Sequence, residues 1–158
     1  MSDAPAQIKF GTDGWRAVIA REFTFANVER VAQAYADFLT REAGPGTKPF
    51  VVIGFDRRFL SEKFAARAAE VMVANGFRIA LFTDAQPTPL ISWAVKDLGA
   101  TGGVMITASH NPANFNGFKI KAPWGGSAAP ETTREVEQLV DATPPKRADV
   151  SDDGHALL

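Results

Sequence analysis

Amphipathic helical segments alternate with short apolar runs along most of the chain, and this alternation constrains the fold more than any other sequence feature. The run that starts at Phe50 is continuously apolar, as in strands buried on both faces of a sheet. In chain order, the expected elements are a helix over 24–42, a strand over 50–56, a helix over 61–76, a strand over 77–82, a helix over 88–99 and a strand over 102–107. This order predicts an α/β fold, a three-layer α/β/α sandwich around a small mixed, mostly parallel sheet.

Residues that are typical of helix ends support these boundaries. Thr24 is the expected N-cap of the first helix, and Ser61 opens the second. Gly76 and Gly99 stand where helices commonly end with a glycine.

The remainder of the chain is expected to add one strand and one helix. Residues 116–120 (NGFKI) indicate a turn followed by a short strand, which lies antiparallel to its predecessor because the connection is short. Residues 130–142 indicate a last helix, and residues 146–158 are polar. We therefore expect one domain over 1–145, followed at 146–158 by a polar linker or the tail left by a truncation.

Composition excludes several classes of function. The 158 residues carry a formal net charge of −1, so the chain has no bulk attraction for nucleic acid or for an anionic membrane. It contains no cysteine, which excludes disulfides and thiolate metal sites and fits a reducing compartment. The N-terminal sequence does not resemble a signal peptide, and no stretch is long enough to span a bilayer. We expect a cytoplasmic protein.

The segment GGVMITASHNP places Ser109 and His110 directly after a predicted core strand. Ligands of open α/β sheets bind beyond the carboxyl ends of the strands, so both side chains are expected on a functional edge. Adjacent side chains diverge, which disfavours a serine hydrolase that uses His110 as the base for Ser109. The G-x-S-x-G pattern is also absent.

Phosphate chemistry fits this segment better. A phosphate on Ser109 would need cationic partners. The candidates are Arg16, Arg57, Arg58, His110 and Lys119.

Taken singly, each of these residues also has an ordinary structural interpretation. Ser109 could be a turn residue, and Lys119 could be a solvent-facing residue of an alternating strand. Arg57 and Arg58 could pair with Asp56 or Glu62, and Asp13 could belong only to a turn.

Four motifs, considered together, favour a functional interpretation. They are FGTDGWR from Phe10, GFDRR from Gly54, TASHNP from Thr107 and NGFK from Asn116. In this order and at these separations they resemble the first domain of the α-D-phosphohexomutases. The resemblance extends from about Ile8 to the last predicted helix.

The resemblance implies a role for each motif. Ser109 would carry the phosphoryl group exchanged with a hexose phosphate, and its phosphate would be one ligand of an active-site Mg²⁺. His110 and Lys119 match positions linked to proton transfer and phosphate electrostatics, and Arg16 matches an arginine near the phosphoserine. Thr12 and Asn111, within the same motifs, are expected to contact phosphate with Arg16. The implied partners are a hexose phosphate and the remaining domains of the enzyme.

The sequence also departs from the family pattern. Ala17 stands where many members have glycine. The family's aspartate-rich metal loop, sugar-recognition loop and C-terminal phosphate loop have no counterpart in these residues. We therefore expect little mutase activity from this chain alone.

Two other functions stay open at the level of sequence. The chain could be a stand-alone module that binds phosphosugars without catalysis, in which case Ser109 would be unphosphorylated. A phosphatase that uses Ser109 covalently ranks lower, because it would need a metal site that the sequence does not provide.

Overall fold

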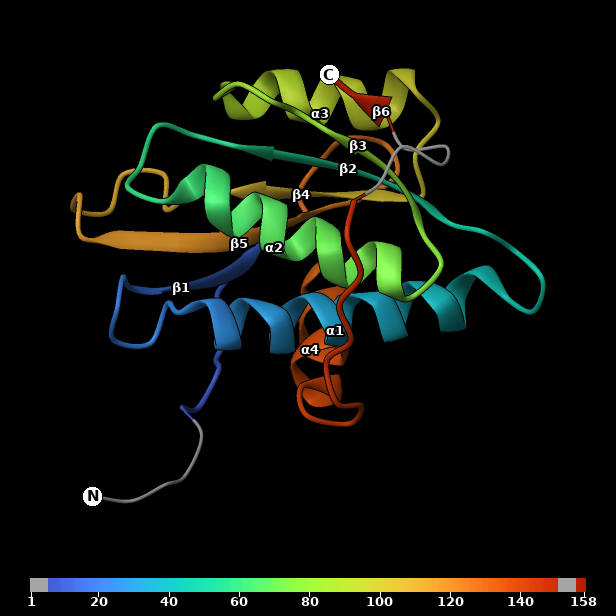
Figure 1. The fold of residues 1–158 in the computed structure, drawn as a ribbon, viewed down its shortest axis with the longest axis horizontal. Helices are drawn as coiled ribbons and strands as arrows, with labels where there is room; N and C mark the ends of the chain where they lie inside the picture. Colours follow the sequence, from blue (N-terminus) through green and yellow to red (C-terminus); the bar gives the residue numbers. More distant parts are fainter. Residues whose placement is uncertain (1–5, 151–155) are drawn as a thin grey trace.

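The structure, a computed structural model, describes residues 6–150 and 156–158 and places helices on both faces of one sheet (Figure 1). The strands are β1 (Gly14–Val18), β2 (Phe50–Phe55), β3 (Arg78–Leu81), β4 (Gly102–Ile106), β5 (Phe115–Lys121) and β6 (Ala156–Leu157). The helices are α1 (Phe25–Ala43), α2 (Ser61–Ala74), α3 (Thr88–Asp97) and α4 (Pro130–Leu139).

The strand order in the sheet is β1-β5-β4-β2-β3-β6. One part of the sheet is parallel and consists of β4, β2, β3 and β6. Strand β5 is antiparallel to both of its neighbours, β4 and β1. The expected mixed, mostly parallel sheet is thus confirmed.

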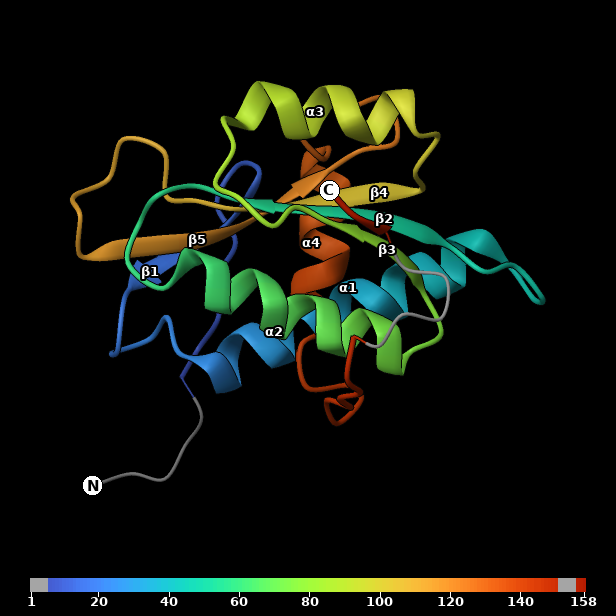
Figure 2. The same cartoon turned by 45° about the horizontal axis from the view of Figure 1, so that its top comes forward.

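Each face of the sheet has its own hydrophobic core, which completes the expected three layers (Figure 2). On one face α1 and α2 pack on side chains such as Ile53, Val104 and Phe118. On the other face α3 packs on Val52 and Met105. The strands in the middle of the sheet are apolar on both sides for this reason.

The expected helix boundaries are confirmed to within a few residues. The Thr24 side chain accepts a hydrogen bond from the backbone N–H of Asn27 at 3.3 Å, as an N-cap does. Gly76 and Gly99 both have positive φ just beyond the helices that they end.

Two parts of the sheet differ from expectation. Strand β1 was not expected, because its sequence GWRAV is short and begins with a glycine. In the structure Trp15 and Ala17 lie in the core, and β1 pairs with β5 along its whole length. The turn expected at Asn116 is wrong, because Asn116 and Gly117 lie inside β5. Gly117 is needed there for close packing, since a Cβ on it would lie 2.6 Å from the carbonyl oxygen of Thr107.

The residues after α4 contact the domain. The backbone N–H of Ala148 donates to the Glu70 carbonyl at 3.1 Å, and the backbone N–H of Lys146 donates to Gln33 Oε1 at 3.2 Å. Ala156–Leu157 extends the sheet beside β3. Part of the predicted tail, residues 151–155, lies outside the described residues, and the domain boundary at residue 145 stays a prediction.

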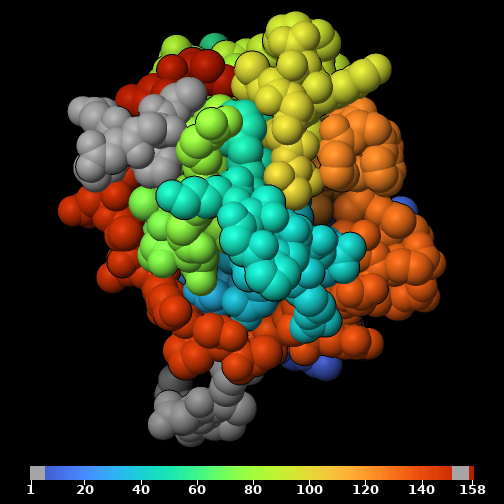
Figure 3. All heavy atoms as spheres, turned by 90° about the vertical axis from the view of Figure 1, so that its right-hand side faces the viewer, coloured from blue at the N-terminus to red at the C-terminus, as the bar shows by residue number. Residues whose placement is uncertain are grey.

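The carboxyl ends of β2, β3 and β4 meet at one edge of the sheet, on the left in Figure 1. The loops over 56–60, 82–87 and 107–114 therefore lie at this edge. Figure 3 shows the opposite end of the molecule, where the connection over 44–49 projects in cyan. Within the described residues, no helix combines the length and hydrophobicity needed to cross a bilayer.

Candidate functional site

Ser109 lies in the loop that follows β4 and is exposed to solvent. Its φ of 55° is in the left-handed region, which costs a residue with a Cβ roughly 1–2 kcal/mol. Its backbone N–H donates to Thr107 Oγ1 at 3.0 Å, so the first residues of the loop are fixed by a side chain at the end of the strand. The loop thus holds an exposed hydroxyl group in a conformation that needs support from the surrounding structure.

Asp56, at the end of β2, supplies part of this support. Its Oδ2 accepts a hydrogen bond from Thr107 Oγ1 at 2.6 Å. Its Oδ1 accepts from the backbone N–H of Arg58 and from Ser61 Oγ, both at 3.0 Å. Asp56 therefore joins β2, the start of α2 and the end of β4 into one polar network.

Asn116 extends the same network to β5. Its side chain is fully buried and donates from Nδ2 to Ser61 Oγ at 2.8 Å. Its Oδ1 accepts from the backbone N–H of Gly117 at 2.9 Å. The buried amide is thus satisfied on both sides, as a buried polar group requires.

A second set of contacts runs from the loop to β1 and β5. Arg16 Nη1 donates to Asn111 Oδ1 at 3.0 Å, and Arg16 Nη2 lies 3.7 Å from Asp13 Oδ1. Lys119 Nζ donates to Asp13 Oδ2 at 2.9 Å. The antiparallel register makes these contacts possible, because it sets Arg16 opposite Gly117 and Gly14 opposite Lys119.

The structure thus brings together three of the residues predicted from sequence: Arg16, Asn111 and Lys119. The Lys119 side chain is only 12% exposed, so the solvent-facing interpretation of it is wrong. The interpretation of Asp13 as only a turn residue is also wrong, since its carboxylate is shared between two cations.

Apart from Ser109 itself, the two remaining residues of the predicted site, His110 and Thr12, make none of these contacts. Among the described residues, His110 makes no hydrogen bond or ion pair, and its side chain is exposed next to Ser109. Thr12 is also exposed, in a hollow that is formed by residues 9–14 and Arg16. Ser109 lies in a different hollow, lined also by Arg57, Phe59 and Asn111.

Sequence reasoning gave no supporting role at the site to five residues, namely Asp13, Asp56, Ser61, Thr107 and Asn116. All but Ser61 lie within the four motifs, and the expected pairing of Arg58 with Asp56 is confirmed. Asp56 could have been found from its place directly after a buried strand, at the edge where ligands bind.

Charge and burial shift the pKa of two groups near Lys119. Burial alone would raise the pKa of the Asp13 carboxyl, but the hydrogen bond and charge of Lys119, with the charge of Arg16, outweigh burial and lower it. Lys121 is 6% exposed, and burial lowers the pKa of its ammonium, with a further contribution from the charge of Lys119. Positive charge is therefore concentrated on this part of β5 and is partly balanced by Asp13.

The described residues do not fit a complete metal site. None of them form a group of three or more histidine or acidic side chains that could hold an ion. A phosphate on Ser109 would offer one oxygen ligand, which is fewer than Mg²⁺ takes in proteins.

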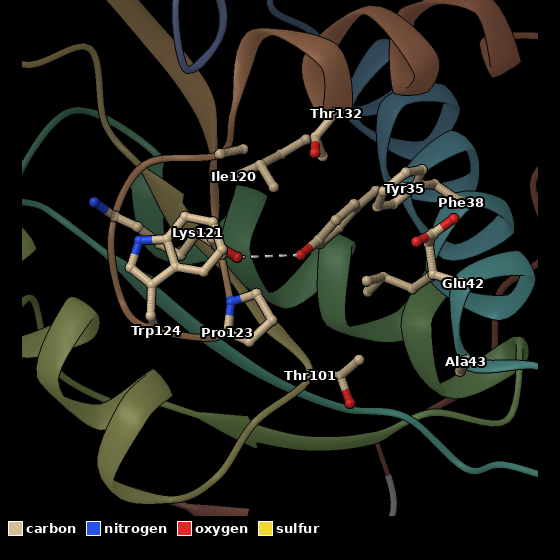
Figure 4. Close-up of a pocket in the computed structure, with 13 residues that line it drawn as sticks. Tyr35, Phe38, Glu42, Ala43, Thr101, Ile120, Lys121, Pro123, Trp124 and Thr132 are labelled. Carbon is tan, nitrogen blue, oxygen red and sulfur yellow. Dashed lines mark hydrogen bonds between the residues drawn. The ribbon is translucent and has the colours of Figure 1, made fainter.

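A separate apolar cavity of about 240 Å³ lies between α1 and the end of β5 (Figure 4). The ring of Tyr35 points into it, and the Tyr35 hydroxyl group lies 3.5 Å from the backbone oxygen of Lys121. The cavity shares no lining residue with the hollow at Ser109, so it is not part of the site.

Comparisons with known proteins agree with this fold and motif set. Residues 7–147 match the profile of phosphoglucomutase/phosphomannomutase, alpha/beta/alpha domain I. A probable phosphoribomutase of Schizosaccharomyces pombe is 43% identical over 126 residues, which are 78% of this chain and 21% of that protein. A phosphoglucomutase of Staphylococcus saprophyticus is 37% identical over 139 residues, which are 85% of this chain and 24% of that protein.

Solved structures show the same relationship. A crystal structure assigned to a phosphomannomutase of Thermus thermophilus superposes with a TM-score of 0.85 and 41% identity. The match covers 98% of this chain and 34% of that one. This chain thus spans about a quarter of the length of the two curated relatives described above. The chain belongs to the phosphoglucomutase/phosphomannomutase family and carries its alpha/beta/alpha domain I.

Proposed function

We propose that this chain is the phosphoserine-bearing domain of a Mg²⁺-dependent phosphohexomutase. The observation that carries the proposal is the presentation of Ser109, an exposed hydroxyl group on a strained loop fixed from several sides. A group that transfers phosphate must be accessible to its substrate and must keep a constant position, because misplacement lowers the rate.

The proposed reaction has two transfers. A hydroxyl group of the hexose phosphate attacks the phosphorus atom of phosphorylated Ser109, the bond from phosphorus to Ser109 Oγ breaks, and a hexose bisphosphate forms. Ser109 Oγ then attacks the phosphorus atom of the other phosphate, the bond from that phosphorus to the sugar oxygen breaks, and the isomeric hexose monophosphate is released. One proton leaves the attacking hydroxyl group and one returns to the departing oxygen in each transfer.

Arg16 and Lys119 are proposed to balance the phosphate charge, and His110 and Lys119 to assist proton transfer. The link from Arg16 through Asn111 to the Ser109 loop supports this assignment. Thr12 and Asn111 are proposed as further phosphate contacts. Mg²⁺ would neutralise charge on the transferred group, and its other ligands would have to come from outside the described residues.

The partners proposed are a hexose phosphate and the remaining domains of a longer mutase. Two exposed aromatic residues support an interdomain contact, since Trp93 and Trp124 are 59% and 64% exposed. The absence of cysteine fits a reducing compartment, so we propose that the protein works in the cytoplasm.

The test is isomerisation of glucose 1-phosphate and mannose 1-phosphate by the complete gene product with Mg²⁺ and a catalytic amount of hexose bisphosphate. We expect turnover, one phosphoryl group on Ser109 by mass spectrometry, and a loss of about a thousandfold or more in Ser109→Ala. Ser92→Ala, a change on α3, is the matched control.

Three results would overturn the proposal. Full activity of Ser109→Ala would exclude the carrier role. Turnover of ribose 1-phosphate in place of the hexose phosphates would contradict the substrate class. Rapid turnover by the 158-residue chain alone would contradict the need for further domains.

A further inference from the structure

The side chain of Arg58 lies beneath the Ser109 loop and is 13% exposed. Its Nη2 donates to the carbonyl oxygens of Ser109 and Asn111, both at 2.8 Å. Its Nη1 donates to the carbonyl oxygens of Pro112 at 2.8 Å and Phe115 at 3.0 Å. One side chain therefore contacts four carbonyl groups across the whole loop.

The remaining donor of Arg58 is also engaged. Its Nε lies 3.3 Å from Asp56 Oδ2. A guanidinium group has five N–H donors in a fixed planar arrangement. Four hydrogen bonds from Nη1 and Nη2 go to the loop carbonyl groups, and Nε is held in an ion pair with Asp56. Arg58 is thus not free to bind a phosphate, in contrast to the role that its position in the sequence suggested.

Arg57 lines the same hollow as Arg58 but differs from it in exposure and in contacts. Its side chain is exposed, and among the described residues it makes no hydrogen bond or ion pair. It lines the hollow next to Ser109 without contacting the loop carbonyls.

We propose that Arg58 is a positioning residue that holds the phosphoryl-carrying loop in its left-handed conformation at Ser109. This inference rests on the proposed function of Ser109 and extends it. The Ser109 carbonyl oxygen is fixed by Arg58, and the Ser109 N–H is fixed by Thr107. With both polar backbone groups held, the peptide units on either side of Ser109 cannot rotate toward the sterically favoured region.

Asp56 connects the Arg58 side chain, which we call the clamp of the Ser109 loop, to the rest of the polar network. It orients Arg58 through Nε and through the backbone N–H of the same residue, and it binds the hydroxyl group of Thr107. The two side chains that hold Ser109, those of Arg58 and Thr107, are therefore both bound by the Asp56 carboxylate. Of these two, within the described residues, only Arg58 also contacts the far end of the loop, at Phe115, so its loss removes that contact.

The first test measures amide hydrogen exchange in the 158-residue chain and does not depend on catalysis. The backbone N–H groups of Asn111 and Phe115 donate within the loop, to Ala108 and Pro112, and report its order. We expect Arg58→Met to speed exchange over 108–117 at least about tenfold, while peptides from β3 and α3 stay unchanged. Arg57→Met is the control and should leave loop exchange unchanged.

Arg58→Lys keeps the charge but lacks the planar set of five donors, so its loop should exchange at a rate between those of the wild type and Arg58→Met. If Arg58→Met does not fold, loop exchange is compared between Arg58→Lys and the wild type instead. Unchanged loop exchange in Arg58→Lys and Arg58→Met would overturn the proposal. A uniform increase in amide exchange over the whole chain would also overturn it, because it would indicate a merely structural role for Arg58.

The second test uses the complete gene product. A positioning residue should lower kcat, here by about 10- to 100-fold in Arg58→Lys, with little change in KM. A rise in KM with unchanged kcat would mean that Arg58 binds the substrate phosphate and would overturn the proposal. If the exchange results hold while Ser109→Ala keeps full activity, the clamp stands and the phosphoryl-carrier function fails.

Discussion

Lys119 Nζ lies 2.9 Å from Asp13 Oδ2, although 106 residues separate the two in the chain. The contact joins the residue before β1 to the middle of β5, and the two side chains are 17% and 12% exposed. It adds a side-chain contact to the strand pairing that already joins the first motif of the sequence to the last.

Asp13→Asn should lower stability in a pH-dependent way. The pKa of Asp13 is lower in the folded protein than in the unfolded chain, where it is near 3.8. Its contribution is therefore present above the unfolded pKa and is lost as the pH falls through the folded pKa. We expect a loss of about 1–2 kcal/mol at pH 7, and a smaller loss below about pH 4.

Urea unfolding at several pH values checks this expectation. Asp97→Asn, a change at an exposed position without an ion pair among the described residues, is the control. An equal loss for Asp13→Asn at pH 3 and pH 7 would contradict the assigned charge interaction.

Gly14→Ala should separate β1 from β5. A Cβ at this position would overlap the carbonyl oxygen of Phe118 and lie 2.8 Å from the Cα of Lys119, and these backbone atoms cannot move independently. We expect a loss of about 1–3 kcal/mol in urea unfolding. Gly11→Ala is the matched control, because its Cβ would meet only the Gly14 carbonyl oxygen at 3.6 Å. If the two variants lose the same stability, the close approach is not the cause.

Thr107→Val should weaken the network below Ser109 while keeping the shape of the side chain. The hydroxyl group donates to Asp56 and accepts from the Ser109 N–H, so its loss leaves both groups with one partner fewer. We expect about 1–3 kcal/mol lower stability and faster amide exchange at Ser109. Thr132→Val, on α4, serves for comparison, and an equal effect there would argue against the network.

Thr24→Ala should cost about 1 kcal/mol of stability, because it removes the N-cap acceptor of α1. Thr24→Ser retains the acceptor oxygen and should stay within a few tenths of a kcal/mol of the wild type. Thermal unfolding of both variants tests this, and equal midpoints for Ala and Ser would mean that the cap contributes nothing.

Local patterns in the sequence determined most of the elements. The helical periodicity, the N-cap at Thr24, and the glycines at 76 and 99 depend on residues close together in the chain, so they could be recognised without a structure. The antiparallel placement of β5 followed from a short connection. The motif around Ser109 indicated the family by its residues alone.

Only the tertiary structure decided which polar residues support the site. Arg58 reaches carbonyl groups more than fifty residues away, and Asp13, just before β1, reaches Lys119 on the neighbouring strand β5. Such contacts depend on strand order and register, and neither can be read from local patterns. Strand β1 is the clearest case, because it is so short that only its pairing with β5 identifies it as a strand. Periodicity reports which face of an element is buried, but it carries no information about which distant side chain a polar group meets.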